Sequence, residues 1–314
     1  MSIISLISPM NLEEEKRKFI LDQTYNPQFV YEHSFDDSLL RKWGEPQEKS
    51  VSLARKIMAK RANLLTNRVV IDPRILVNMA KKVFEDVGIT ESIEITFDPQ
   101  KVTRCSVKGT QIIFRDPTEF ESTQEIQATF NHELQTHLLR NLNQMKQGWK
   151  LNREKFDGQI LRTEEGLAVL HSTIALEEKL LWRPSAYYVA VWLGIQMGFS
   201  AMFAELLKMG FNEDFAWRLT IRVKRGLTDT SLPGGNSKDI CYLEGALQMW
   251  RWLGDENHNP RHLYIGKVFI EELDEKLKLM ATRDIYLPIF YKDIPSYRKQ
   301  IQRIGAENFF EEEL

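Results

Sequence analysis

The sequence is poor in cysteine, has no repeat or low-complexity tract and carries almost no net charge. Its two cysteines, Cys105 and Cys241, stand far apart and match no zinc-ligand spacing, so we expect free thiols in a reducing compartment. The net charge of −2 provides no field that favours nucleic acid or an anionic membrane. Residues 1–10 lack the basic start and the apolar length of a signal peptide. The sequence therefore predicts a cytoplasmic protein with neither a nucleic-acid nor a membrane partner.

Long hydrophobic runs are also scarce, and one stretch alone, residues 187–204, is uncharged and mostly apolar. It approaches the length of about 20 residues that a membrane-spanning helix needs. However, it contains Gly194, Gln196 and Gly198, and Glu205 follows it directly. A central helix in the core of a helical protein explains the stretch more simply than a membrane span.

The 314 residues are enough for one large domain or two small ones. We expect an irregular or partly helical lead-in over residues 1–35 and a single catalytic domain over residues 36–314. Apolar residues alternate with polar ones over 92–97, 102–107 and 111–114, which predicts a small antiparallel sheet. Helical spacing prevails elsewhere, so the predicted fold class is α+β and predominantly helical.

A helix that follows the predicted strands carries the chemistry. Ser122 and Glu125 have capping-box spacing, and apolar residues then recur every four positions, which predicts a helix over about 123–144. It would place the functional residues just after the sheet, in a zincin-like arrangement.

His132, Glu133 and His137 on this helix form the pattern HExxxH, one residue longer than the HExxH of metalloproteases. Five residues on an ideal helix separate two side chains by about 140°. A one-residue π-bulge, a feature that is often functional, would bring both imidazoles to one ion. A carboxylate from the next helix, Glu164 or Glu165, would complete three protein ligands and leave an open position for water. The sequence therefore predicts a hydrolytic site that holds one Zn²⁺ per chain.

Glu133 stands next to a predicted ligand and is the predicted general base. It would take the proton from the water that attacks a carbonyl and pass that proton to the leaving amine.

Three ordered blocks between about residues 120 and 250 resemble a known family. The blocks are His132-Glu133-x-x-Thr136-His137, then Glu164-Glu165-Gly166-Leu167-Ala168, then Arg222-x-x-Arg225-Gly226, Pro233-Gly234-Gly235-x-x-Lys238-Asp239 and Tyr242-Leu243-x-Gly245. Together they are similar to the QEGLA-motif family of bacterial proteins. That family includes the microtubule-associated tyrosine carboxypeptidases, zinc enzymes that remove the C-terminal tyrosine of α-tubulin.

The resemblance implies a zinc metallocarboxypeptidase with His132, His137 and Glu165 as metal ligands and Glu133 as the catalytic glutamate. Glu164 stands where the family name has Gln, and the additional negative charge is expected to alter metal affinity or the pKa of bound water. The implied substrate is the C-terminus of a peptide or protein, with an aromatic last residue such as tyrosine. The resemblance alone points to a tubulin-like substrate. Nothing else in this short chain supports it, since the sequence shows no obvious basic extension that would bind tubulin.

A carboxypeptidase must hold a free carboxylate, which Arg does best through its two-pronged guanidinium. The candidates are Arg222, Lys224, Arg225 and Arg140. Arg140 comes seven residues after Glu133, about two turns, and is therefore expected on the same helix face.

Four further residues or segments have possible roles at the site. Tyr242 is the predicted hydrogen-bond donor to the oxyanion, and His171 is a weaker candidate because it points about 240° away from Glu165 on its helix. Asp239 would either orient a ligand imidazole or form a salt bridge. Strand 111–115, as a sheet edge, could hold an extended peptide by strand addition.

Two other functions stay open at this stage. One is a zinc peptidase that trims from the amino end, since HExxxH also occurs in a dipeptidyl-peptidase family. The other is a non-catalytic regulatory protein on the same scaffold, against which the intact Glu133 argues.

Overall fold

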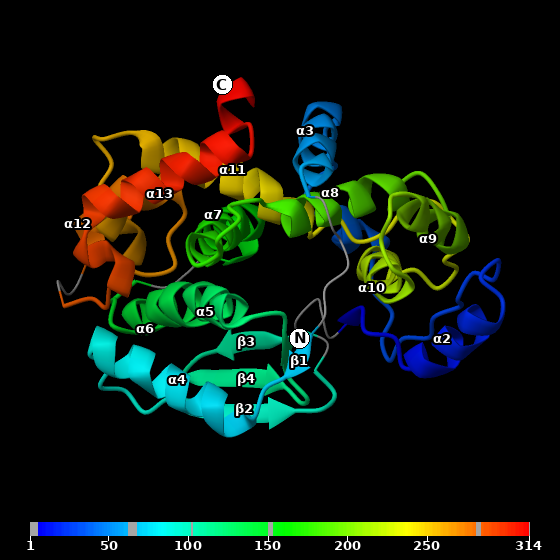
Figure 1. Ribbon diagram of the computed structural model, residues 1–314, viewed down its shortest axis with the longest axis horizontal. Helices are drawn as coiled ribbons and strands as arrows, with labels where there is room; N and C mark the ends of the chain where they lie inside the picture. Colours follow the sequence, from blue (N-terminus) through cyan, green and yellow to red (C-terminus); the bar gives the residue numbers. More distant parts are fainter. Residues whose placement is uncertain (1–5, 62–67, 102, 150–152, 281–283, 314) are drawn as a thin grey trace. The chain divides into compact units, whose positions relative to one another are not determined.

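The computed structural model describes residues 6–61, 68–101, 103–149, 153–280 and 284–313, with the backbone alone for residues 153–160. The chain forms two compact units. We call Thr66–Leu180 with Glu244–Leu314 the sheet unit, and Met1–Leu65 with Leu181–Leu243 the helical unit. About 58% of the chain is helical, which confirms the α+β, predominantly helical fold class (Figure 1). The single domain over 36–314 stays a prediction.

The sheet unit contains a three-stranded sheet of order β2-β4-β3, formed by β2 (Glu94–Asp98), β3 (Cys105–Lys108) and β4 (Gln111–Arg115). β3 and β4 are antiparallel, with the turn at Gly109 (φ +60°). β2 pairs parallel to β4, so the sheet is mixed and the predicted all-antiparallel sheet is wrong in this respect. β4 lies in the centre, with both of its sides paired, and therefore cannot add a peptide strand as predicted for 111–115.

The sheet unit also contains a second, smaller sheet, seven α-helices and four short 3₁₀ turns among its described residues. A two-stranded sheet pairs β1 (Val69–Val70) with β5 (Glu119–Phe120). The α-helices are α4 (Pro73–Val87), α5 (Thr123–His132), α6 (Leu139–Met145), α7 (Arg153–Ile174), α11 (Ile240–Gly254, which begins in the last residues of the helical unit), α12 (Leu273–Leu279) and α13 (Ile294–Glu307). The short 3₁₀ turns are η3 (Pro260–Tyr264), η4 (Ile270–Glu272), η5 (Ile289–Lys292) and η6 (Phe310–Glu313).

The helix predicted over 123–144 is one continuous rod made of α5, a π-helical segment η2 (Glu133–Leu138) and α6. Its start is as predicted, because the Ser122 hydroxyl accepts a hydrogen bond from the Glu125 amide at 3.2 Å. The rod packs against α7, and its π-helical segment packs against β3 (Figure 1).

Two glycines from the motif blocks let α7 approach α11. A Cβ at Gly166 would overlap the backbone of Gly245, and a Cβ at Gly245 would overlap the carbonyl of Arg162. Glycine at both positions therefore fixes the place of α7, which carries Glu164 and Glu165, within the sheet unit.

The described residues of the helical unit include α2 (Leu12–Leu21), η1 (Asp37–Arg41), α3 (Glu48–Ala59), α8 (Trp182–Gly194), α9 (Phe199–Lys208), α10 (Glu213–Lys224) and the first residues of α11. Aromatic rings fill its core, with Phe19 lying 5.1 Å from Phe199 and 4.8 Å from Phe203 between ring centroids. The apolar stretch 187–204 is not one central helix, because α8 ends at Gly194 and α9 begins at Phe199. Within the described part of the chain, no helix has both the length and the hydropathy to span a membrane.

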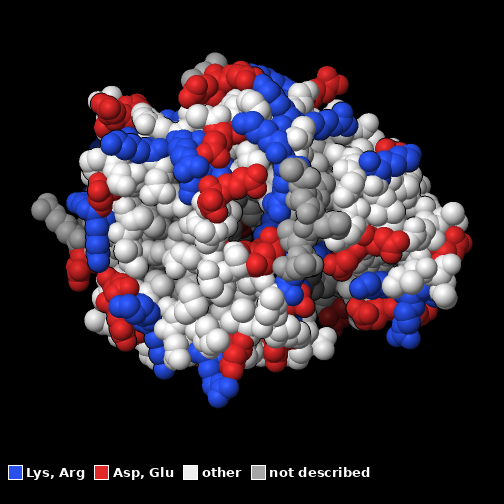
Figure 2. All heavy atoms as spheres, viewed as in Figure 1, with Lys and Arg blue, Asp and Glu red and all other residues white. Residues whose placement is uncertain are grey.

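Charges of both signs are mixed on the surface. Figure 2 shows Lys and Arg side chains beside Asp and Glu side chains over the visible face, in keeping with the net charge of −2. No single sign of charge covers that face.

Candidate metal centre

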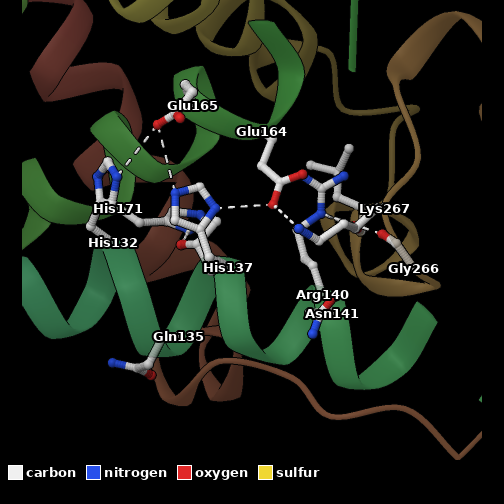
Figure 3. A network of polar contacts seen from close by, with 12 residues as sticks. His132, Gln135, His137, Arg140, Asn141, Glu164, Glu165, His171, Gly266 and Lys267 are labelled. Atoms are coloured by element: carbon white, nitrogen blue, oxygen red, sulfur yellow. Dashed lines mark hydrogen bonds and ion pairs between the residues drawn. The ribbon is translucent and has the colours of Figure 1, made fainter. Parts of the chain in front are cut away.

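His132, His137 and Glu165 meet in the sheet unit (Figure 3). Their nearest ligand atoms all lie within 4.8 Å of one another. Oε2 of Glu165 is 3.5 Å from Nε2 of His132 and 3.6 Å from Nε2 of His137. In a tetrahedral zinc site with bonds of about 2.1 Å, ligand atoms are separated by about 3.4 Å. The three residues therefore fit a zinc ion by both donor type and spacing.

The two histidines converge because the helix is locally π-helical. Residues Glu133–Leu138 adopt the wider i→i+5 pattern, so side chains five positions apart come to the same face. The imidazole centroids are 4.8 Å apart, with the rings at 77° to each other. The bulge predicted from the HExxxH spacing is confirmed.

Hydrogen bonds of buried polar side chains stabilise the π-helical segment. The Thr136 hydroxyl donates to the carbonyl of Asn131 at 2.7 Å and lies 2.8 Å from Nδ1 of His171. Since its one proton is used on the carbonyl, Nδ1 of His171 is the donor of the second bond. On the opposite ring nitrogen, Nε2 of His171 lies 2.9 Å from the Tyr297 hydroxyl. Tyr264 donates to the carbonyl of Gln135 at 2.7 Å.

His171 is thus a structural residue of this network, fully buried, and burial lowers its pKa well below the usual range. The network was not found from the sequence. Thr136 belongs to a motif block, and His171 is the weaker of the two predicted oxyanion donors, but no sequence pattern connects them.

Glu164 and Glu165 face different nitrogens of His137. Glu165 faces Nε2, whereas Oε1 of Glu164 lies 3.0 Å from Nδ1 of His137 and 2.9 Å from Nζ of Lys267. Burial alone would raise the pKa of Glu164, but Lys267 and His137 hold this pKa well below its usual range. This geometry supports Glu165 as the ligand and leaves Glu164 behind the imidazole.

Two further pKa shifts describe the electrostatics around the ligands. Burial raises the pKa of Glu133, although the neighbouring His132 and His137 oppose the rise. Burial disfavours the charged form of His137, but hydrogen bonds to Glu164 and Glu165 raise its pKa to about 10. A raised pKa brings Glu133 closer to the range in which a carboxylate works well as a general base.

Arg140 is fully buried. Its guanidinium donates to the carbonyls of Leu263 at 3.0 Å and Gly266 at 3.4 Å, and also to that of Val268. These bonds give Arg140 a structural role in holding the loop 263–268 and disfavour it as the residue that binds a substrate carboxylate.

The other predicted substrate-binding residues belong to the helical unit. Arg222 forms a two-pronged pair with Asp239, at 2.7 and 2.8 Å, which is the salt-bridge role considered for Asp239. Burial alone would raise the pKa of Asp239, but the Arg222 guanidinium holds this pKa below its usual range. Arg225 is buried.

Lys224 and Tyr242 differ in how much of the side chain is left for a substrate. The Lys224 ammonium is buried and donates to four carbonyls, those of Gly194, Met197, Leu232 and Gly234. Since an ammonium has only three protons, all of them are engaged by these carbonyls, which favours a structural role for Lys224. Tyr242 is partly buried, with its ring 5.8 Å from that of Tyr187. The catalytic role of Tyr242 and the substrate-binding roles of Arg222 and Arg225 stay predictions.

His132, His137 and Glu165 converge on one point, and Glu133 is the neighbour of His132 in the sequence. Metallohydrolases use this kind of site. Comparison with known proteins identifies a family of peptidases. The family described as "Microtubule-associated tyrosine carboxypeptidase" matches residues 28–305, and the chain belongs to this family, as the motif blocks predicted.

Individual relatives are distant but are aligned over nearly all of this chain. The human protein "Microtubule-associated tyrosine carboxypeptidase 1" is 27% identical over 325 residues, which cover 98% of this chain and 68% of the relative. The mouse protein "Putative tyrosine carboxypeptidase MATCAP2" is 28% identical over 326 residues, covering 98% of this chain. The alignment spans 62% of the length of that mouse relative.

Proposed function

We propose that this chain is a zinc-dependent metallocarboxypeptidase, which hydrolyses the C-terminal peptide bond of a peptide or protein and releases an aromatic residue, tyrosine first of all. The observation that carries the proposal is the convergence of His132, His137 and Glu165 beside Glu133. The family and the names of the relatives support the reaction class. A cytoplasmic location goes with the proposal.

Each residue of the centre has a defined part in this reaction. His132, His137 and Glu165 would hold the ion, which when bound activates a water and polarises the scissile carbonyl. Glu133 accepts a proton from the attacking water and gives it to the nitrogen of the leaving amino acid, so the peptide bond breaks and one water molecule is consumed. The raised pKa of Glu133 suits both the uptake and the return of that proton.

Specificity for a C-terminus requires a cation that binds the terminal carboxylate. Arg140 and Lys224 have backbone carbonyls as partners. Arg222, which pairs with Asp239, and Arg225, which is buried, are the candidates that we retain from the predicted set. Tyr242 is proposed as the donor to the oxyanion.

A peptide library with free and with amidated C-termini, analysed by mass spectrometry after incubation with the zinc-loaded protein, tests the proposal. We expect loss of one C-terminal residue from free peptides, strongest for tyrosine, and no cleavage of amidated ones. Cleavage that is indifferent to amidation, or removal of residues from the amino end, would contradict the carboxypeptidase. Purified protein with zinc far below one ion per chain would contradict the metal centre.

A further inference from the structure

The two ring nitrogens of His137 have separate carboxylate partners on α7 (Figure 3). Nε2 faces Glu165, and Nδ1 lies 3.0 Å from Oε1 of Glu164. Glu164 is only 7% exposed, so this contact is sheltered from solvent. Glu164 therefore contacts the side of the imidazole that lies away from the predicted ion.

An ionised carboxylate can only accept hydrogen bonds, so Nδ1 of His137 must carry the proton of this contact. The lone pair of the neutral imidazole then lies on Nε2, the nitrogen that faces Glu165 and the predicted ion. The Glu164 contact thus selects both the tautomer and the ring orientation that metal binding needs.

Lys267 keeps Glu164 in place. Its ammonium lies 2.9 Å from the same Oε1 atom and offsets one of the carboxylate charges that Glu133, Glu164 and Glu165 bring together. The backbone amide of Lys267 donates to Oε1 of Gln144 at 3.1 Å.

The loop 263–268 that presents Lys267 is held by the site helix itself. Arg140 on α6 donates to three carbonyls of this loop. Arg140 and Gln144 therefore connect the far end of the site helix, through Lys267 and Glu164, back to the ligand His137 on the same rod. Arg140 thus helps to position Lys267 and, through it, Glu164, which is a different role from the substrate binding predicted for it beside Glu133.

We propose that Glu164 is a positioning residue for the metal ligand His137, with Lys267 as its counter-ion. The inference rests on the proposed metal centre and concerns a position at which this chain departs from the Gln of the family's motif name. Hydrogen-bond partners of ligand histidines typically change metal affinity by about 10–100-fold when they are removed.

Two substitutions of similar volume separate hydrogen bonding from charge. Glu164→Gln and Glu164→Met both remove the negative charge and both leave Lys267 without its carboxylate. The amide oxygen of Gln is a strong acceptor for the Nδ1 proton, whereas the thioether sulfur of Met is only a weak one. Glu244→Gln is the matched control, because Glu244 on α11 also pairs with a cation, Arg162 on α7, at 3.2 Å.

The experiment titrates metal-free protein with Co²⁺ and records the affinity and the visible spectrum of the bound ion. We expect Glu164→Met to bind Co²⁺ about tenfold or more weakly than Glu164→Gln, with an altered spectrum, and Glu244→Gln to match the wild type. Equal affinities and spectra for the Gln and Met variants would overturn the positioning role. Glu164→Ala, whose side chain has no acceptor, is the second variant, should the Met variant not fold. Absence of Co²⁺ binding by the wild type would instead contradict the proposed function itself.

Discussion

Thr136 offers a direct test of how the π-helical segment is stabilised. Its hydroxyl donates to the carbonyl of Asn131, five residues earlier, and accepts from Nδ1 of His171, and the residue is fully buried. Thr136→Val keeps the shape of the side chain but removes both hydrogen bonds. The carbonyl and the imidazole N–H are then left in a buried place without the hydroxyl.

The expected magnitude follows from the two groups that lose a partner. Leaving one buried polar group unsatisfied costs about 1–3 kcal/mol, so the loss of a partner by two groups in Thr136→Val should destabilise the fold by about 2–6 kcal/mol. Since the entropy of unfolding is about 2.1 cal/mol/K per residue, this corresponds in a chain of 314 residues to a decrease in Tm of about 3–9 °C. We expect the metal affinity to fall as well, because His132 and His137 would reach one ion only while the segment keeps its π-helical form.

Thermal unfolding of the metal-free protein, followed by far-UV circular dichroism, measures this effect. Thr129→Val is the matched control, since the Thr129 hydroxyl donates at 3.0 Å to the carbonyl of Glu125, four residues earlier on α5. That carbonyl also belongs to the regular helix, so we expect a change below about 1 kcal/mol. A Tm for Thr136→Val equal to that of the control would refute the role given to the hydroxyl.

Three further predictions follow from individual contacts. Lys224→Met should destabilise the helical unit by about 3 kcal/mol or more in urea unfolding, because four carbonyls lose their donor, and unchanged stability would contradict the structural role. Gly166→Ala should lower Tm by several degrees more than Gly254→Ala, whose added Cβ meets no atom within 4 Å, since the Cβ at position 166 overlaps the backbone of Gly245. Because the pKa of His137 is raised to about 10 in the metal-free protein, zinc binding should displace a proton at neutral pH. The zinc affinity, measured by competition with a chelator, should therefore rise by about tenfold per pH unit between about pH 7 and 9. A zinc affinity that is independent of pH would contradict this.

The parts of the site that are local in sequence could be predicted. Ser122 and Glu125 give the start of the site helix, and the five-residue spacing of His132 and His137 is unfavourable on a regular helix, which is why it predicts a bulge. The candidates for the third ligand lie on the next helix, α7, within the same sequence neighbourhood.

The place of Arg140 could not be predicted, for a reason that the bulge itself supplies. Seven residues amount to two turns only on a regular α-helix. The π-helical segment between Glu133 and Arg140 changes this phase, and Arg140 lies in the core against the loop 263–268. Lys267 was missed because it lies far along the chain from Glu164, and no local pattern indicates which distant loop meets which helix.

The mixed sheet has a similar origin. Alternation over 92–97 identifies a half-buried strand but carries no information about its direction relative to a neighbour. Since β3 and β4 form the hairpin, β2 pairs with the far edge of β4 in parallel register, an arrangement set by the connections and not by the strand sequences.

The central claim, that Glu133 is the base of a zinc carboxypeptidase, is tested most directly by Glu133→Gln. The measurement is the release of free tyrosine from a peptide that ends in tyrosine with a free carboxylate, with zinc content determined on the same samples. We predict about one zinc per chain in both proteins and turnover lower by a factor of about 10²–10⁴ in the variant. Turnover near that of the wild type by the zinc-loaded variant would contradict it.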